Sequence, residues 1–367
     1  MPAGSPSPVT VIPRSLRAEQ LKRLSFLCGL PLGGRKEELI TRLTAAAAAA
    51  ASNAPSPSSS SARSRAAGPV VLSIDLGIRN LAYSLMTPVS TSASSRKNTK
   101  ASLSTGTSPP AIKLHAWQRL SLLDSAAALS NSSDEDGVNA FAPAVLAKTA
   151  NAFLQETVMR LAPLPTHILI ERQRWRSGGA AAIQEWTVRV NTLEAMLHAS
   201  LRTLRDVGVW KGEVASIQPL RVGQLFLGGA EETDSSVQRR GAEEDVADTT
   251  GRKPGRKRAG GRKTSAETKK LKIELLGRWL GQGDAVIAPG SNNAGLMVDA
   301  YRGALSGARR SRSKRAAKEE ETGENIVTLG SKLDDLTDSL MQGMAWLRWR
   351  ENMALLRLEN GVERLLE

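Results

Sequence analysis

The chain is organised around one apolar segment that ends in a single carboxylate, Val70-Val71-Leu72-Ser73-Ile74-Asp75-Leu76-Gly77-Ile78-Arg79-Asn80. A short run of β-branched and aliphatic residues after a Gly-Pro pair favours a buried central strand over a helix. An isolated carboxylate costs free energy inside a sheet, so Asp75 is expected at the rim, in a site or beside a cation. Gly77 would let backbone or a phosphate approach it closely.

A second apolar run, Thr166-His167-Ile168-Leu169-Ile170-Glu171-Arg172-Gln173, repeats this pattern and also ends in a carboxylate. We expect it to form another strand of the same sheet. The remaining expected elements are strands at 81–86 and 112–120, helices at 141–161, 182–206 and 267–280, and a strand with its exit at 214–226. We expect Trp186, Trp210 and Trp279 in the core, with Ile183 beside Trp186 on the buried stripe of the 182–206 helix.

The last expected helix, Lys332 to about Leu358, begins Lys332-Leu333-Asp334-Asp335-Leu336-Thr337-Asp338. Residues three or four apart share a helix face, so Asp338 can converge with Asp334, with Asp335 or with both. Further along, Ala345, Trp346 and Trp349 lie on the acidic side, which indicates that this side is buried as well. The plainer interpretation is that these acids merely favour a helix start.

Two carboxylates at strand ends and a third group on a helix would together form an all-oxygen site. Such ligands suit Mg²⁺ or Mn²⁺. Sites of this kind commonly hold two ions about 3.5–4 Å apart, one activating water and the other stabilising the leaving oxygen of a phosphodiester. We therefore expect two ions per site, held by Asp75, Glu171 and the acidic helix.

The order strand-acid, hairpin, helix, strand-acid, helix, acidic helix is the layout of the ribonuclease H-like nucleases. Within that group the chain resembles the fungal mitochondrial Holliday-junction resolvases. The segments that carry the resemblance are 73–80, 170–176, 191–197, 269–273 and 332–340. The resemblance implies an α/β fold with a mixed sheet flanked by helices. It also implies a mitochondrial homodimer that cuts two strands of a four-way DNA junction, with Mg²⁺ or Mn²⁺.

The resemblance further implies which residues act. The metal ligands would be Asp75, Glu171, Asp338 and one or both of Asp334 and Asp335, and the catalytic set would be Asp75, Glu171, Asp335 and Asp338. The residues expected to contact DNA are Lys36, Arg79, Arg172, Arg174, Trp175, Arg176, Lys269, Lys270 and Lys332. Arginine binds phosphate bidentately and tryptophan stacks on exposed bases. Alternatively, Arg172 and Arg174 pair with the acids, Trp175 lies in the core and Lys332 faces water.

A helical hairpin is expected at residues 15–44, ahead of the main domain. Its leucine spacing, the glycines before its second helix and Lys36 at that helix's start resemble the DNA-binding SAP motif. The alternative is a hairpin that only docks on the main domain, with Cys28 as a buried apolar residue. The expected organisation is a disordered or targeting segment at 1–14, the SAP-like hairpin, a flexible linker at 45–68, and a nuclease domain at 69–360 with insertions at 87–110, 229–266 and 303–325.

The net charge of +14 indicates a polyanionic partner, and it is concentrated in two segments. Residues 252–272 hold ten basic side chains and one acid, and residues 309–318 hold six basic side chains and no acid. These runs could equally be solubilising tails, and Arg252 to Arg258 also resembles a nuclear import signal. One cysteine and three histidines exclude an intramolecular disulfide and make a thiolate or histidine metal site unexpected. No apolar run approaches about 18 residues, so no membrane partner is expected.

Two other functions remain open from the sequence. A catalytically silent junction-binding protein would keep the fold and lose an acid, and none is missing here. An actin-like or sugar-kinase-like ATPase also begins with a strand and Asp-x-Gly, but it needs further glycine-rich phosphate loops. Nucleotide binding would separate that alternative from the nuclease.

Overall fold

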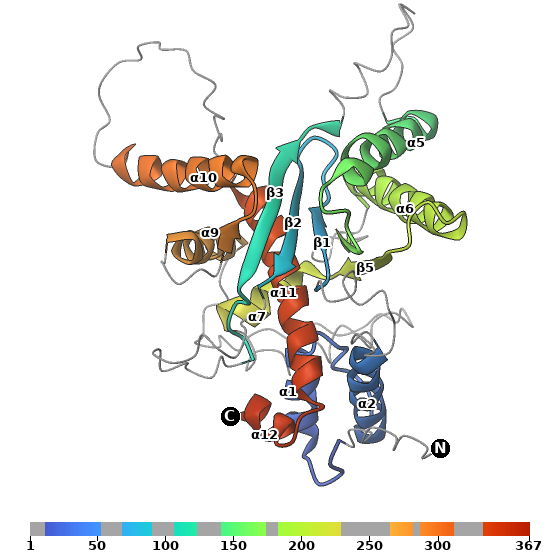
Figure 1. Ribbon diagram of the computed structural model, residues 1–367, viewed down its shortest axis with the longest axis vertical. Helices are drawn as coiled ribbons and strands as arrows, with labels where there is room; N and C mark the ends of the chain where they lie inside the picture. Colours follow the sequence, from blue (N-terminus) through green and yellow to red (C-terminus); the bar gives the residue numbers. More distant parts are fainter. Residues whose placement is uncertain are drawn as a thin grey trace, which may run out of the picture.

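Three layers form the molecule, with a central sheet between two groups of helices (Figure 1). The computed structural model describes residues 12–52, 68–89, 106–122, 141–173, 183–228, 265–281, 287–311 and 333–367. None of the helices in these ranges is long and apolar enough to cross a membrane.

The sheet has six strands in the order β5-β4-β1-β2-β3-β6. Their bounds are β1 Val71–Asp75, β2 Leu81–Pro88, β3 Ile112–Leu120, β4 His167–Glu171, β5 Glu213–Ile217 and β6 Ile287–Pro289. Only β2 is antiparallel to its neighbours, and all other neighbouring pairs are parallel. The predicted mixed sheet flanked by helices is confirmed, with the strand that carries Asp75 near its middle.

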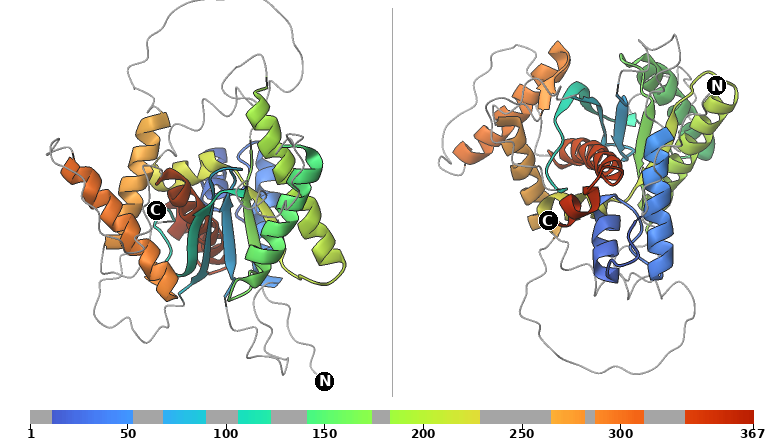
Figure 2. Two further views of the ribbon diagram at one scale, coloured as in Figure 1. Left: turned by 90° about the horizontal axis from the view of Figure 1, so that it is seen from above. Right: turned by 60° about the horizontal axis from the view of Figure 1, so that its bottom comes forward.

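The helices divide between the two faces of this sheet, as Figure 2 shows from above. One face carries α5 (Pro143–Ala152), which continues through Phe153–Thr157 and Val158–Arg160, and α6 (Glu185–Asp206). The other carries α7 (Pro219–Leu227), α9 (Ser265–Gly281), α10 (Asn292–Ser311) and α11 (Asp334–Leu355). The hairpin α1 (Ala18–Leu27) and α2 (Lys36–Ser52) packs at one end of α11 together with α12 (Gly361–Leu366).

Helix α11 lies unusually close to β1 and β2 because it carries a glycine where it crosses them. A Cβ on Gly343 would overlap the end of the Met86 side chain and stand 3.2 Å from Ser73 Cβ. Nearby, Ser84 Oγ donates a hydrogen bond to the Ser339 carbonyl at 3.0 Å. Such short, buried contacts fix the helix over the sheet, which determines where the acids in its first turns lie.

The hairpin docks on the same helix. Gly29 has a left-handed φ of 67°, and a Cβ there would lie 2.5 Å from the Trp349 ring, so only glycine fits this turn. Asn352 Nδ2 donates to the Leu27 carbonyl at 2.6 Å, and Arg221 Nη1 donates to the Gly29 carbonyl at 2.8 Å. Cys28 is fully buried. The docking that the sequence left as an alternative is therefore present, and SAP-type DNA binding stays a prediction.

Several boundaries differ from the sequence expectation. Residues 219–227 form helix α7 rather than a strand exit, because Pro219 occupies the first helical turn, where its missing N–H is not needed. Helix α2 continues to Ser52, past the expected end at residue 44, because alanine has the highest helix propensity. Strand β6 and helices α10 and α12 were not predicted.

Two expectations about the core were wrong. Trp186, in the first turn of α6, and Ile183, which precedes that helix, are 43% and 42% exposed, whereas the buried residues of α6 begin at Val190. Trp210 and Trp279 are buried as predicted.

The expected insertions are only partly within the described residues. The 87–110 segment is anchored at its second end, where Gly106 and Ser108 carbonyls accept hydrogen bonds from Asn352 and Arg348 of α11. Helix α10 runs to Ser311, so its part of the 303–325 segment is helical. Of 229–266 only residues 265–266, in α9, are described. Residues 1–11, and 53–67 of the expected linker, lie outside the described ranges.

Candidate active site

Asp75 and Glu171 end two adjacent parallel strands, so their side chains meet at one edge of the sheet. Ile74 of β1 pairs with Ile170 of β4, which places the next residue of each strand at the same level. The two carboxyl groups are close enough that Glu171 raises the pKa of Asp75. Glu171 Oε2 also accepts from Gln173 Nε2 at 3.2 Å. The sequence predicted this convergence from the matching ends of the two apolar runs.

Asp75 lies in an environment that disfavours its negative charge. Burial has the largest effect in raising the pKa of Asp75 well above its ordinary range, followed by the hydrogen bond with Glu171. The negative charges of Glu171, Asp338 and Asp335 raise this pKa further. Asp335 and Asp338 of α11 are therefore close enough to interact electrostatically with the strand acids. Asp334 is not among the groups with the largest effects on the pKa of Asp75.

Two lysines of α9 face the acids of α11. Lys272 Nζ lies 2.8 Å from Asp338 Oδ1, and Lys269 Nζ lies 2.8 Å from Asp334 Oδ2. Burial has the largest single effect and opposes ionisation of Asp334, but the hydrogen bond and the positive charge of Lys269, together with backbone hydrogen bonds, lower the pKa of this carboxyl. Lys272 is the better shielded of the two lysines, with 12% of its side chain exposed against 53% for Lys269.

Several residues that position the site were not identified from the sequence. Gln342 Nε2 donates to Ser73 Oγ at 3.1 Å and to the Ile74 carbonyl at 3.2 Å, joining α11 to β1 beside Asp75. Arg119 Nη1 of β3 lies 3.9 Å from Asp335 Oδ2. Lys272 belonged to a recognised segment but had no assigned role. Its spacing of three from Lys269 places both lysines on one helix face, and that signal could have identified it.

The donor chemistry of this edge fits a hard divalent cation, although the ligands are not gathered around one point. Within the described ranges, no three acidic, histidine or cysteine side chains are grouped closely enough to be ligands of one ion. The available donors are carboxylate oxygens, which suit Mg²⁺ and Mn²⁺. A cation would also remove the repulsion that raises the pKa of Asp75. Lys272 would compete with a cation for Asp338, as would Lys269 for Asp334 if Asp334 also takes part.

The residues expected to contact DNA are dispersed over several elements. Arg79 follows β1 and is exposed, Arg172 follows β4 and is exposed, and Lys36 is exposed at the start of α2. Lys269 pairs with Asp334, while Lys270 lies 3.8 Å from Glu274 of its own helix. Arg174, Trp175, Arg176 and Lys332 lie outside the described residues.

Comparison with known proteins identifies relatives of this chain. The family described as mitochondrial resolvase Ydc2 / RNA splicing MRS1 matches residues 71–356, which include the sheet and all five candidate acids. The mitochondrial cruciform cutting endonuclease 1 of Schizosaccharomyces pombe is 31% identical over 179 residues. That match spans 49% of this chain and 53% of the relative, about half of each protein.

Solved structures of three resolvases are also similar. The match to the yeast mitochondrial Holliday junction resolvase Ydc2 covers 92% of this chain and 95% of the Ydc2 chain, with 19% identity and a TM-score of 0.46. The fowlpox virus resolvase, solved with Holliday junction DNA, covers 76% of this chain and 96% of its own, at 12% identity and a TM-score of 0.30. The match to Thermus thermophilus RuvC covers 66% of this chain and 96% of the RuvC chain, at 14% identity and a TM-score of 0.27. The resemblance expected from the motifs is confirmed by the family match, and the chain belongs to the mitochondrial resolvase Ydc2 / RNA splicing MRS1 family.

Proposed function

We propose that this chain is a metal-dependent endonuclease that resolves four-way DNA junctions by paired phosphodiester hydrolysis. The observation that carries the proposal is the convergence of Asp75 and Glu171 at one sheet edge with Asp335 and Asp338 nearby. Membership of a family whose description includes a resolvase supports it. The named activities of the relatives, a cruciform cutting endonuclease and Holliday junction resolvases, point the same way.

In this proposal Asp75, Glu171, Asp335 and Asp338 hold Mg²⁺ or Mn²⁺, two ions per site, with Asp334 as a further candidate ligand. Such ions supply an activated water and stabilise the leaving oxygen when they are bound. Lys272 and Lys269, which pair with Asp338 and Asp334, would be placed to pair with phosphate oxygens if these acids held a cation. The acids and these lysines would therefore exchange partners as metal and DNA arrive together.

The proposed assembly is a homodimer in mitochondria, with one acidic site for each of two opposing strands. Arg79, Arg172 and the segment 174–176 would contact the junction centre next to the acids. Lys269, Lys270 and Lys332 would contact DNA at the α9 and α11 side. The docked hairpin, with Lys36 exposed, would bind an arm of the junction in the manner of a SAP motif. The mitochondrial names of the relatives support this compartment.

The test is a gel assay of end-labelled four-way, three-way and linear duplex DNA with Mg²⁺, Mn²⁺ or EDTA. We expect paired cuts in the four-way junction with either metal and none with EDTA. Linear duplex cut as fast as the junction would refute structure selectivity, and cutting in EDTA would refute the metal requirement. Sedimentation of the junction complex would show whether two copies bind.

The same assay separates the other functions. The family description also names RNA splicing, and a chain acting only in that way, or a silent junction binder, would bind nucleic acid without cutting it. An ATPase would hydrolyse nucleotide with no DNA present. The complete set of acids favours the nuclease.

A further inference from the structure

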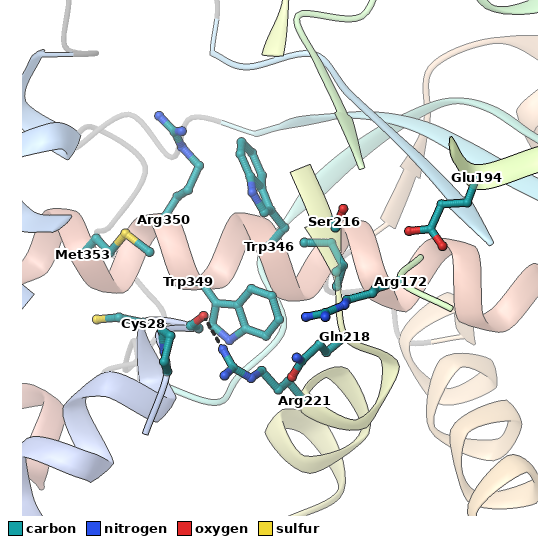
Figure 3. A pocket seen from close by; sticks show the side chains of 13 residues that line it. Cys28, Arg172, Glu194, Ser216, Gln218, Arg221, Trp346, Trp349, Arg350 and Met353 are labelled. Atoms are coloured by element: carbon teal, nitrogen blue, oxygen red, sulfur yellow. Dashed lines mark hydrogen bonds between the residues drawn. The ribbon is translucent and has the colours of Figure 1, made fainter. Parts of the chain in front are cut away.

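A cavity of about 470 Å³ lies between the docked hairpin, the end of β5 with the start of α7, and the middle of α11 (Figure 3). Its volume is within the range of about 300–1000 Å³ that is typical of small-ligand sites. None of the candidate acids lines it, so it is separate from the acidic edge of the sheet. It nevertheless adjoins that edge, because Arg172, the residue after Glu171, is part of its lining.

The charge of the lining is predominantly positive. Arg172, Arg221 and Arg350 contribute three guanidinium groups, and Glu194 is the one carboxylate in the lining that the structure describes. Glu194 Oε2 already accepts the Gln173 backbone N–H at 3.1 Å. Burial lowers the pKa of both Arg221 and Arg350. The attraction of Glu213 partly offsets this for Arg350, whereas neighbouring Arg42 adds to it for Arg221. An anion in the cavity would stabilise these charges.

A buried donor in the same wall lacks an acceptor. Trp349 is 5% exposed, and its Nε1–H has no hydrogen-bond partner among the residues that the structure describes. Buried indole N–H groups normally have a hydrogen-bond acceptor, and leaving one unpaired is destabilising. In Figure 3 the guanidinium groups of Arg172 and Arg221 point toward this indole. A ligand oxygen could accept from Trp349 and from an arginine together.

The cavity also offers aromatic surface. Trp346 is partly exposed, and the guanidinium of Arg350 lies 4.8 Å from its ring centroid. Aromatic and guanidinium planes of this kind stack on nucleobases without selecting one sequence. Phosphate binding and base stacking are thus available within one pocket.

We propose that this cavity is a nucleotide-binding site, in which Arg172, Arg221 and Trp349 Nε1 bind the phosphate and the base lies beside Trp346 and Arg350. The nucleotide is one unit of the DNA substrate, displaced from its stack next to the strand held at Glu171; this identification rests on the proposed function. The cavity also joins the hairpin to the nuclease body, through the Arg221 hydrogen bond to Gly29, so an occupied cavity would hold the two together.

Calorimetric titration of the full chain tests the chemistry of the site, with a deoxynucleoside 5′-monophosphate, inorganic phosphate and the matching deoxynucleoside as separate ligands. We expect the monophosphate to bind more tightly than either part. Trp349→Phe keeps an aromatic ring and removes the donor, so it should weaken monophosphate binding about tenfold. Trp279→Phe, the same change in a buried tryptophan packed on Phe226 of α7, should leave it unchanged. Equal loss of monophosphate affinity in the two variants would overturn the proposed site. So would a nucleoside that binds as tightly as the nucleotide.

A second variant and the DNA arm complete the test. Arg350→Gln should weaken binding of the monophosphate while keeping both tryptophans of the cavity. It therefore tests the site even if Trp349→Phe folds poorly. In EDTA, Trp349→Phe should weaken four-way junction binding several-fold, and the monophosphate should compete with the junction. Unchanged junction binding would show that the ligand is a free nucleotide and overturn its identification as a DNA unit. If the chain binds the nucleotide through Trp349 but never cuts DNA, the proposed nuclease function is refuted and the nucleotide site is retained. If it cuts junctions but does not bind the nucleotide, the site is refuted and the nuclease function is retained.

Discussion

The two halves of helix α11 present opposite electrostatic problems. Its first turns carry acids that face the carboxyl groups of Asp75 and Glu171, so negative charge accumulates there. Its later turns carry Trp349 and Arg350, which line a cavity with three arginines and one carboxylate. One helix therefore borders two different regions. Its first turns lie beside Glu171, where the acidic edge suits a cation, and its later turns line the basic cavity with Arg172, which suits an anion.

The protein resolves these problems differently in the two regions. At the acidic end, Lys269 and Lys272 of α9 pair with Asp334 and Asp338, so part of the charge is already balanced. At the cavity the arginines face carbonyls and indoles, and Trp349 Nε1 has no partner among the described residues. The acidic end can exchange one set of partners for another, whereas at the cavity a ligand would supply the acceptor that Trp349 Nε1 lacks among the described residues. The predictions below alter one region while leaving the other intact.

The largest effect is expected when the two neighbouring acids of α11, Asp334 and Asp335, are substituted one at a time. Asp335→Asn should reduce junction cleavage more than about 100-fold, since even outer-shell partners of a metal are worth about 10–100-fold. Asp334→Asn should cost only several-fold, because Asp334 pairs with Lys269, whereas Asp335 is among the groups that raise the pKa of Asp75 most. Single-turnover cleavage rates measure both. The reverse ranking would assign the ligand to Asp334.

The next effect concerns how α11 is held over the sheet. Gly343→Val should lower the free energy of unfolding by about 1–3 kcal/mol, because its side chain overlaps Met86 and Ser73 in a packed core. Gly303→Val in α10 is the matched control, since nothing lies within 4 Å of a Cβ there and the position is exposed. Urea unfolding curves report both. Equal midpoints would mean that α11 can move away from the sheet without cost.

The cavity end can be disturbed through the hairpin. Burial raises the pKa of the Cys28 thiol to about 12, so it should react slowly with thiol reagents in the native protein. Gly29→Ala introduces a Cβ against Trp349 at a left-handed φ, and should speed this labelling about tenfold by favouring an undocked hairpin.

Gly33→Ala is the control in the same turn, because nothing lies within 4 Å of its Cβ and its φ is not left-handed. Cys28 is the only cysteine in the chain, so the labelling rate has a single source. Fast labelling of the unaltered protein would contradict the docked arrangement.

The smallest effect is expected from removing a competing lysine. Lys272→Met should tighten Mn²⁺ binding a few-fold without DNA, because Asp338 would no longer be paired with an ammonium group. Lys270→Met, whose lysine faces Glu274 of its own helix, should leave Mn²⁺ affinity unchanged. Weaker Mn²⁺ binding by Lys272→Met would show that this lysine orients the acid rather than competing for it.

Much of this arrangement could be predicted from the sequence because the pattern was strong where the site lies. Apolar runs ending in Asp75 and Glu171 specify two buried strands with acids at one edge, and the apolar stripe of 333–347 specifies the helix beside them. The same kind of signal located β2 and β3. These elements hold the site together, so the family and the acids could be recognised before the fold was known.

What the sequence could not give depends on tertiary contacts. Arg119 reaches Asp335 from β3, and no local pattern pairs residues so far apart; the spacing of Lys272 from Lys269 marks a helix face but not the acid that this face meets. Trp186 has the right helical spacing for the core yet is exposed, because periodicity shows a face and not what covers it. The cavity is formed by segments from the hairpin, β4, β5, α6, α7 and α11, and it exists only after they assemble.

The central claim is that the acids at the sheet edge cut a four-way junction that other parts of the protein bind. The most direct test compares Asp75→Asn with the unaltered protein in parallel assays of binding and of Mg²⁺-dependent cleavage, on one labelled four-way junction. We expect the variant to bind the junction with unchanged affinity in EDTA and to lose cleavage with Mg²⁺. Cleavage by the variant at the unaltered rate would contradict the claim and remove Asp75 from the site.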